Sequence, residues 1–339
     1  MTTPNLPAST HRGRLRTLIC AGTIAATLPY LTLKAAWVAG SSIGVHGDGM
    51  HSGAMIGANL ATLGMDAIAA ALALALARPW GRRIPGWLLI LPMWVATGLL
   101  APIALVVPVA AVVGVLTDGF SSSGNPGQDF IDGWVYAVVY GGFGLQAVGL
   151  VAGFVLHARE RWAGVFALRL RDLPVGPAAG ARRLIAAGVA AFGLIPVGIQ
   201  LSWAFGSHAL RPGDTRTASQ SLIIDSGYAL IILAGLIAML AVTRQRPDGG
   251  PALRLLVTAW VGTGTAFGWG LFWLISSSLS TPLNKGDDMR GLALVGGFQT
   301  LAGAVLATVL ALMVVQAAAA PAGQGASEDG GDRSGMIPA

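Results

Sequence analysis

Apolar residues fill most of this chain in long stretches that short polar segments separate. Eight stretches reach the roughly 20 residues that a helix needs to cross a hydrocarbon core about 30 Å thick. The pattern therefore predicts an all-α polytopic membrane protein with eight transmembrane helices. The eight predicted spans lie at residues 17–41, 53–77, 84–110, 133–157, 184–207, 219–243, 255–280 and 291–316.

The third stretch is the least regular of the eight. From Ile84 to Leu116 it is too long for one straight span, and it contains Pro92, Pro102 and Pro108. Proline removes a backbone hydrogen-bond donor and bends a helix. We expect a kink or a short extension on the outer side of the membrane.

The composition agrees with a membrane protein. Hydrophobic residues make up 54% of the chain and charged residues 11%, against about a quarter charged in soluble domains. The 48 glycines suit helices that pack closely through small residues. Cys20 is the single cysteine, which excludes an internal disulfide and any Cys-x-x-Cys site. The lipid bilayer is thus the first partner that the sequence predicts.

Basic residues predict the orientation. With a cytoplasmic N-terminus, 16 of the 21 lie in inner segments, Lys34 lies in a span, and four lie outside: Arg211, Arg216, Lys285 and Arg290. Such a bias marks the cytoplasmic side, so we expect both termini inside, in the plasma membrane of a bacterial-type cell. Because these residues sit in short loops, the net charge of +6 does not indicate a nucleic-acid partner.

The second half of the chain repeats the first. A shift of 166 positions places residues 16–41 on 182–207, so that Trp37 meets Trp203 and Gly40-Ser41 meets Gly206-Ser207. At the same shift "WVATG" at 94–98 meets "WVGTG" at 260–264. After a change in loop length, "YGGF" at 140–143 meets "VGGF" at 295–298. The match predicts two four-helix repeats of the same orientation, related by a pseudo-twofold axis along the membrane normal.

The repeat divides the chain into five segments and bears on the first span. A basic leader before an apolar stretch also resembles a signal peptide, but the internal partner of this span argues that it remains in the protein. The expected segments are a basic cytoplasmic leader (1–16), the first four-span repeat (17–157), a cytoplasmic linker (158–183), the second four-span repeat (184–317) and a disordered cytoplasmic tail (318–339).

Four polar residues occupy equivalent positions in the predicted spans. Lys34 in the first span matches Gln200, and Asn59 in the second span matches Asp225. A charge inside the bilayer costs about 2.5–3.5 kcal/mol and usually faces the bundle interior beside a partner. Because Lys34 and Asp225 lie at similar depth, we expect them to pair. Such a pair would either hold helices together or form a ligand, ion or proton site; the remaining alternative is that Lys34 extends to the outer interface.

Asp66 near the centre of the second span has no ionisable counterpart, because Ile232 stands at the equivalent position. It is two turns from Asn59 on the same helix face. One interpretation is a protonated carboxyl bonded to a neighbouring helix, and the other is a residue that couples transport to a proton or cation. We also expect Gln146 and Gln299 to make interhelical hydrogen bonds.

Other chemistry is weakly indicated. His46, Asp48 and His51 in "HGDGMH" are metal-capable residue types, but the second half lacks the histidines, and a solvated loop is the favoured interpretation. No metal site, cofactor or catalytic residue is predicted, since the chain has no Walker, Gly-x-Ser-x-Gly or His-Glu-x-x-His motif.

Three function classes remain, and an enzyme is the least favoured. The first is a carrier for a small molecule or ion, with its site between the two halves and its pathway residues Lys34, Asn59, Asp66, Gln200 and Asp225. The second is a non-catalytic scaffold, or a subunit of a larger envelope or export complex with a membrane-protein partner. The third is a lipid-acting enzyme that uses the outer acidic residues Asp118, Asp129, Asp132, Asp287 and Asp288.

Overall fold

Eight long apolar helices form the structure, a computed structural model that describes residues 8–46, 52–118, 131–174, 177–211, 216–246, 251–278 and 289–319. Each helix is long and apolar enough to cross a membrane, which confirms the eight predicted spans. The chain is therefore an integral, multi-pass membrane protein. The helices are α1 (Ala8–Val38), α2 (Gly53–Ala77), α3 (Gly86–Asp118), α4 (Gly133–Arg161), α6 (Ala179–Ala204), α7 (Ala218–Arg244), α8 (Leu253–Ser278) and α9 (Arg290–Ala319).

Helix α3 is the longest of these helices. It remains one helix of 33 residues although Pro92, Pro102 and Pro108 lie inside it. At 1.5 Å per residue it is about 50 Å long, well beyond a hydrocarbon core of about 30 Å. The extension expected for the third span is thus present.

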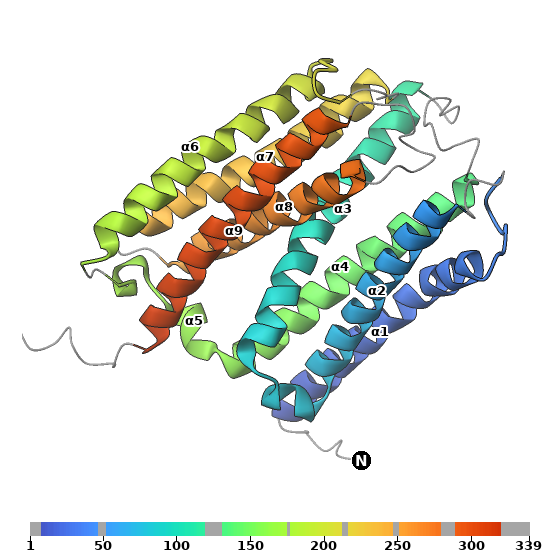
Figure 1. The fold of residues 1–339 in the computed structure, drawn as a ribbon. Helices are drawn as coiled ribbons and strands as arrows, with labels where there is room; N and C mark the ends of the chain where they lie inside the picture. The colour runs from blue at the N-terminus through green and yellow to red at the C-terminus, as the bar shows by residue number, and fades with distance from the viewer. Residues whose placement is uncertain are drawn as a thin grey trace, which may run out of the picture.

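The helices form two groups with α3 between them (Figure 1). Helices α1, α2 and α4 pack together, and α6, α7, α8 and α9 form the second group. Helix α3 belongs to the first half of the sequence, yet it packs mainly against α7 and α8, contacts α4 less, and only touches α2. It is therefore the element that joins the two groups.

The crossing of α3 and α8 depends on a pair of glycines. A Cβ atom added to Gly98 would lie 2.1 Å from the carbonyl carbon and oxygen of Gly264. Two hydrogen bonds flank the contact: Trp94 Nε1 donates to Thr263 Oγ1 at 3.2 Å, and Thr265 Oγ1 donates to the carbonyl of Gly98 at 3.1 Å. The two Trp-Val-x-Thr-Gly segments that match in sequence therefore lie against each other.

The C-terminal ends of α1 and α6 are built alike. Trp37 Nε1 donates to the carbonyl of Ile43 at 2.8 Å, and Trp203 Nε1 donates to the carbonyl of Ala209 at 2.6 Å. Gly40 and Gly206 follow these helices with φ of 94° and 89°, a conformation that favours glycine and closes a helix end. The sequence match here coincides with a match in local structure.

The opposite ends of the two groups also carry corresponding polar contacts. Arg16 on α1 lies 2.5 Å from Glu160 on α4, and Arg82 lies 2.6 Å from the same carboxylate. In the other group Arg182 on α6 donates to Gln316 on α9 at 3.1 Å. The contacts of Arg16 and Arg182 each join the first and the fourth long helix of their half.

The linker at 158–183 folds onto the second group. It contains the short helices α5 (Ala163–Ala167) and η3 (Leu170–Asp172), and Leu170 and Leu173 are buried in the core of the second half. At the chain ends, α1 begins within the predicted leader, whereas the predicted tail lies outside the described residues from 320 onward.

The glycine contact predicts that Gly98→Ala weakens the protein. The new methyl group would overlap the backbone of Gly264, and overpacking of this kind costs about 1–3 kcal/mol. Gly114→Ala on the same helix is the matched control, because a Cβ there has no atom within 4 Å, and alanine raises helix stability by about 0.5–1 kcal/mol. Thermal unfolding in detergent measures both, and equal unfolding temperatures for the two variants would contradict the close contact.

Candidate functional site

The first helix group encloses an ion pair. Lys34 Nζ on α1 lies 3.2 Å from Asp66 Oδ2 on α2. The lysine side chain is 1% exposed and the aspartate side chain 7% exposed. Both charges are thus removed from solvent and lipid, between helices that cross the membrane.

Helix geometry explains how the two side chains meet. Lys34 lies one turn before the end of α1, whereas Asp66 lies in the middle of α2. Side chains on a helix lean toward its N-terminus, and consecutive spans run in opposite directions. The two side chains therefore lean toward each other, and the long lysine spans the remaining difference in depth.

Two further residues complete the site. Lys34 Nζ lies 3.9 Å from the centre of the Tyr30 ring, one turn earlier on α1, which is a favourable cation–π distance. Tyr30 in turn packs edge-on against Phe143 of α4, with ring centres 5.1 Å apart. Gln146 of α4 is buried and reaches the Asp66 carboxylate with its side-chain amide. The site thus draws on α1, α2 and α4.

Two sequence-based expectations about this pair are wrong. Lys34 does not pair with Asp225, and Asp66 is not a lone carboxylate, because the two residues bind each other. The expectation compared only the depths of the helix positions and ignored the length and direction of the lysine side chain. Nor does Lys34 extend to the outer interface, since it is 1% exposed.

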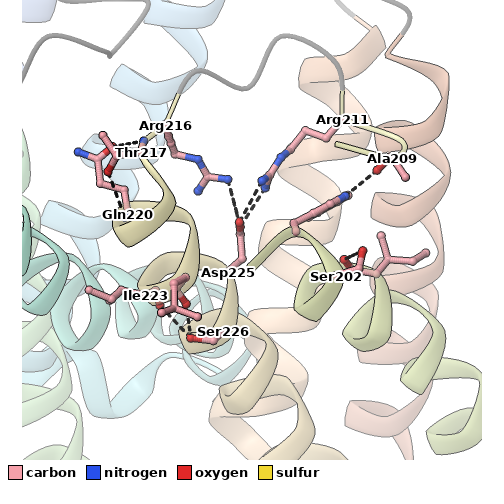
Figure 2. A network of polar contacts seen from close by, with 12 residues as sticks. Ser202, Ala209, Arg211, Arg216, Thr217, Gln220, Ile223, Asp225 and Ser226 are labelled. Carbon is pink, nitrogen blue, oxygen red and sulfur yellow. Dashed lines mark hydrogen bonds and ion pairs between the residues drawn. The ribbon is translucent and has the colours of Figure 1, made fainter. Parts of the chain in front are cut away.

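Asp225 on α7 pairs with two arginines of the preceding loop region (Figure 2). Arg211 contacts both carboxylate oxygens at 2.9 and 3.0 Å, and Arg216 reaches Oδ2 at 2.9 Å. The Arg211 guanidinium also lies over the Trp203 ring, 4.4 Å from its centre. This cluster joins the C-terminal end of α6 to the N-terminal part of α7.

The Asp225 cluster accounts for two of the basic residues that fall outside in the predicted topology. Arg211 and Arg216 are 12% and 20% exposed at their side chains and bind a carboxylate that is 5% exposed. Their charge therefore neutralises a buried acid. The short distance in sequence from Arg211 and Arg216 to Asp225 was the feature from which this pairing could have been predicted.

The remaining predicted pathway residues do not join Lys34 and Asp66 in one layer. Asn59 is buried on α2, and Thr62 between it and Asp66 donates its hydroxyl to the carbonyl of Ala58. Gln200 is buried on α6, in the other helix group. The structure thus separates the five residues into an ion pair in the first group, an arginine-bound carboxylate near the start of α7, and the buried amides of Asn59 and Gln200 in different helix groups.

The two span glutamines, for which we expected interhelical hydrogen bonds, differ in their surroundings. Gln146 lies near the Asp66 carboxylate. Gln299 is 0% exposed, and neither atom of its amide has a hydrogen-bond partner among the described residues. The expectation for Gln299 is therefore wrong within this part of the chain.

His46, the described member of the weak metal candidates, binds a carboxylate in an outer loop. Its Nε2 lies 2.7 Å from Asp132 Oδ1, with both side chains exposed. This hydrogen bond lowers the pKa of Asp132. Asp48 and His51 lie outside the described residues, and the described ones contain no group of three metal-capable side chains.

Two chemical events could break the buried ion pair. A proton on Asp66 would cancel its charge and weaken its hold on Lys34. An anionic group that entered the site would compete with Asp66 for the lysine ammonium. Either event changes contacts between α1 and α2, which is how a local charge change can move helices.

Comparisons with known proteins do not assign a role to this site, so we interpret it from its geometry. No family model, no curated protein and no solved structure matches this chain.

The buried pair predicts that the losses of stability from two single substitutions do not add up in the double variant. Lys34→Met or Asp66→Leu alone removes one partner, and leaving a buried charge uncompensated costs about 3–5 kcal/mol. The Lys34→Met/Asp66→Leu double variant removes both charges and should regain most of that stability. Thermal unfolding in one detergent compares them, and a double variant that loses the sum of the two single effects would contradict the pairing.

Proposed function

We propose that this protein is a membrane carrier for a small molecule or ion, in which Lys34 and Asp66 form the coupling site. The observation that carries the proposal is the ion pair itself, 3.2 Å apart and almost fully buried inside the transmembrane bundle. Ionisable residues inside a membrane are expensive and commonly lie on proton or ion pathways.

Helix adhesion alone is a weaker explanation for the pair. A buried ion pair is often no more stable than well-packed apolar residues of similar size. Asp66 faces Lys34 here, whereas the equivalent position of the second half holds the buried apolar residue Ile232. The fold thus accommodates an apolar side chain at this place in a helix, and the charge indicates a use beyond packing.

The proposed site lies inside the first helix group and not between the halves, where the sequence favoured it. Lys34, Asp66 and Gln146 come from α1, α2 and α4, while α3 makes the main contact with the second group. Helix α3 also packs on the first group, because it contacts α4, and its residues Leu89 and Met93 belong to the buried core of that group. The charge pair on α1 and α2 therefore lies away from the main contact with the second group.

We further infer a duplicated architecture and an N-in, C-in orientation in the plasma membrane. The paired helix ends at Trp37 and Trp203, and the contacts of Arg16 and Arg182, support the duplication. An even number of spans places both termini on one side. The excess of arginine in the segments on that side favours the cytoplasm.

A scaffold or complex subunit is the second candidate. In a scaffold, the same ion pair would hold α1 and α2 together permanently, and water would not reach it. An enzyme acting on lipids has less support, because Asp132, the outer acid whose side chain is described, is bound to His46.

Thiol accessibility distinguishes a carrier from a scaffold without knowledge of the substrate. The single cysteine, Cys20, is buried, so Cys20→Ala gives a background without thiols. In that background Thr62→Cys places a thiol one turn from Asp66 on the same face. A carrier must open this face to water, so we expect Thr62→Cys to react with a charged, membrane-impermeant thiol reagent from each side of oriented vesicles.

Leu60→Cys is the matched control. Leu60 is 49% exposed on the same helix and would face lipid, where a charged reagent does not reach. No reaction at Thr62→Cys from either side, as for Leu60→Cys, would contradict the carrier and favour the scaffold.

A further inference from the structure

The interior of the second helix group holds two amides without partners. Gln200 on α6 is 1% exposed and Gln299 on α9 is 0% exposed. In both side chains the oxygen and the nitrogen are buried, and none of the four atoms has a hydrogen-bond partner among the described residues. Buried polar groups in proteins nearly always have partners, from protein or from bound molecules. Four such atoms within one helix group point to a bound molecule.

The two amides lie at about the same depth. Trp203 on α6 and Val295 on α9 belong to one buried cluster. Gln200 precedes Trp203 by one turn, and Gln299 follows Val295 by one turn. Because α6 and α9 run in opposite directions (Figure 1), both steps lead the same way along the bundle. Both amides therefore lie on the stripe of their helix that carries this cluster.

Comparison with the ion pair explains why Gln200 lacks a partner. Gln200 stands at the position of Lys34, and Ile232 stands at the position of Asp66. Ile232 is 2% exposed in the apolar core of the second group. The group that accepts a hydrogen bond in the first half is thus replaced by an alkyl chain in the second.

We propose that a small uncharged molecule with both a hydrogen-bond donor and an acceptor binds between Gln200 and Gln299. A primary amide offers two N–H donors and a carbonyl acceptor, so a hydroxyl, an amide or a water molecule satisfies both side chains. A charged ligand does not fit, because Val197 and Ala302, each one turn from one of the amides on its helix, are buried and apolar and would leave a charge without a partner.

This second site is separate from the Lys34–Asp66 pair, and it can exist whether or not the protein is a carrier. Its ligand is either water or a small solute that carries the same hydrogen-bonding groups. Two measurements distinguish these sources.

The first measurement is thermal unfolding with acetamide as the probe. A ligand that binds the folded state raises its unfolding temperature, and we expect a rise of about 2–4 °C for the wild type at saturating acetamide. N,N-dimethylacetamide, which has no N–H donor, should give no such rise. Gln200→Leu/Gln299→Leu should lose the response, while Gln316→Leu should keep it, because Gln316 on α9 already binds Arg182. If the double variant does not fold, Gln299→Met takes its place.

The second measurement is a cryo-EM map of the wild type without added solute. A response to acetamide supports a solute site. Density between the two amides without such a response identifies bound water and also supports the site. The absence of both the response and the density would overturn the proposal, because the amides would then be buried without a ligand.

Discussion

A charge inside a membrane must find a partner within the protein, and the Lys34–Asp66 pair shows how this chain meets that constraint. Neither lipid nor the apolar helix faces can solvate an ammonium or a carboxylate. The two charges are brought together from α1 and α2 at 3.2 Å, with the Tyr30 ring against the lysine and Gln146 near the carboxylate. The packing of α1, α2 and α4 depends on this arrangement, because each helix contributes a group that the others need.

The two halves satisfy the same constraint in different ways. The first half buries its charges together in the interior. The second half places Asp225 near the start of α7, where Arg211 and Arg216 reach it from the loop region, and buries the neutral amides of Gln200 and Gln299. Similar helix ends and glycine-rich crossings thus frame two different interiors. In the duplication that we propose, one copy has a charged interior site and the other a neutral polar site, which is consistent with a different role for each.

Much of the fold could be predicted from the sequence, because the membrane fixes the length and polarity of a spanning helix. All eight helices lie where the apolar stretches of the sequence predict them. The long apolar stretch of α3 is one helix in spite of its three prolines. Trp37 and Trp203, which the sequence aligns, also make similar hydrogen bonds at their helix ends.

Side-chain pairing was less predictable than helix position. Lys34 was matched to Asp225 by depth along the helices, but a lysine reaches several ångströms toward the N-terminus of its helix, and Asp66 was within that reach. The arginines that hold Asp225 lie in a loop, where the sequence gives no direction to a side chain. The partition of helices into groups, with α3 against α7 and α8, depends on packing between segments far apart in the chain, which periodicity does not encode.

The most direct test of the central claim is infrared difference spectroscopy of the Asp66 carboxyl group as the pH is lowered. A site that water reaches exchanges protons with the medium while the protein stays folded. We expect the carbonyl band of a protonated carboxyl to appear reversibly in the wild type and to be absent from Asp66→Asn. Identical difference spectra for the two proteins at every pH at which they remain folded would contradict the claim, because the pair would then be a sealed contact between helices.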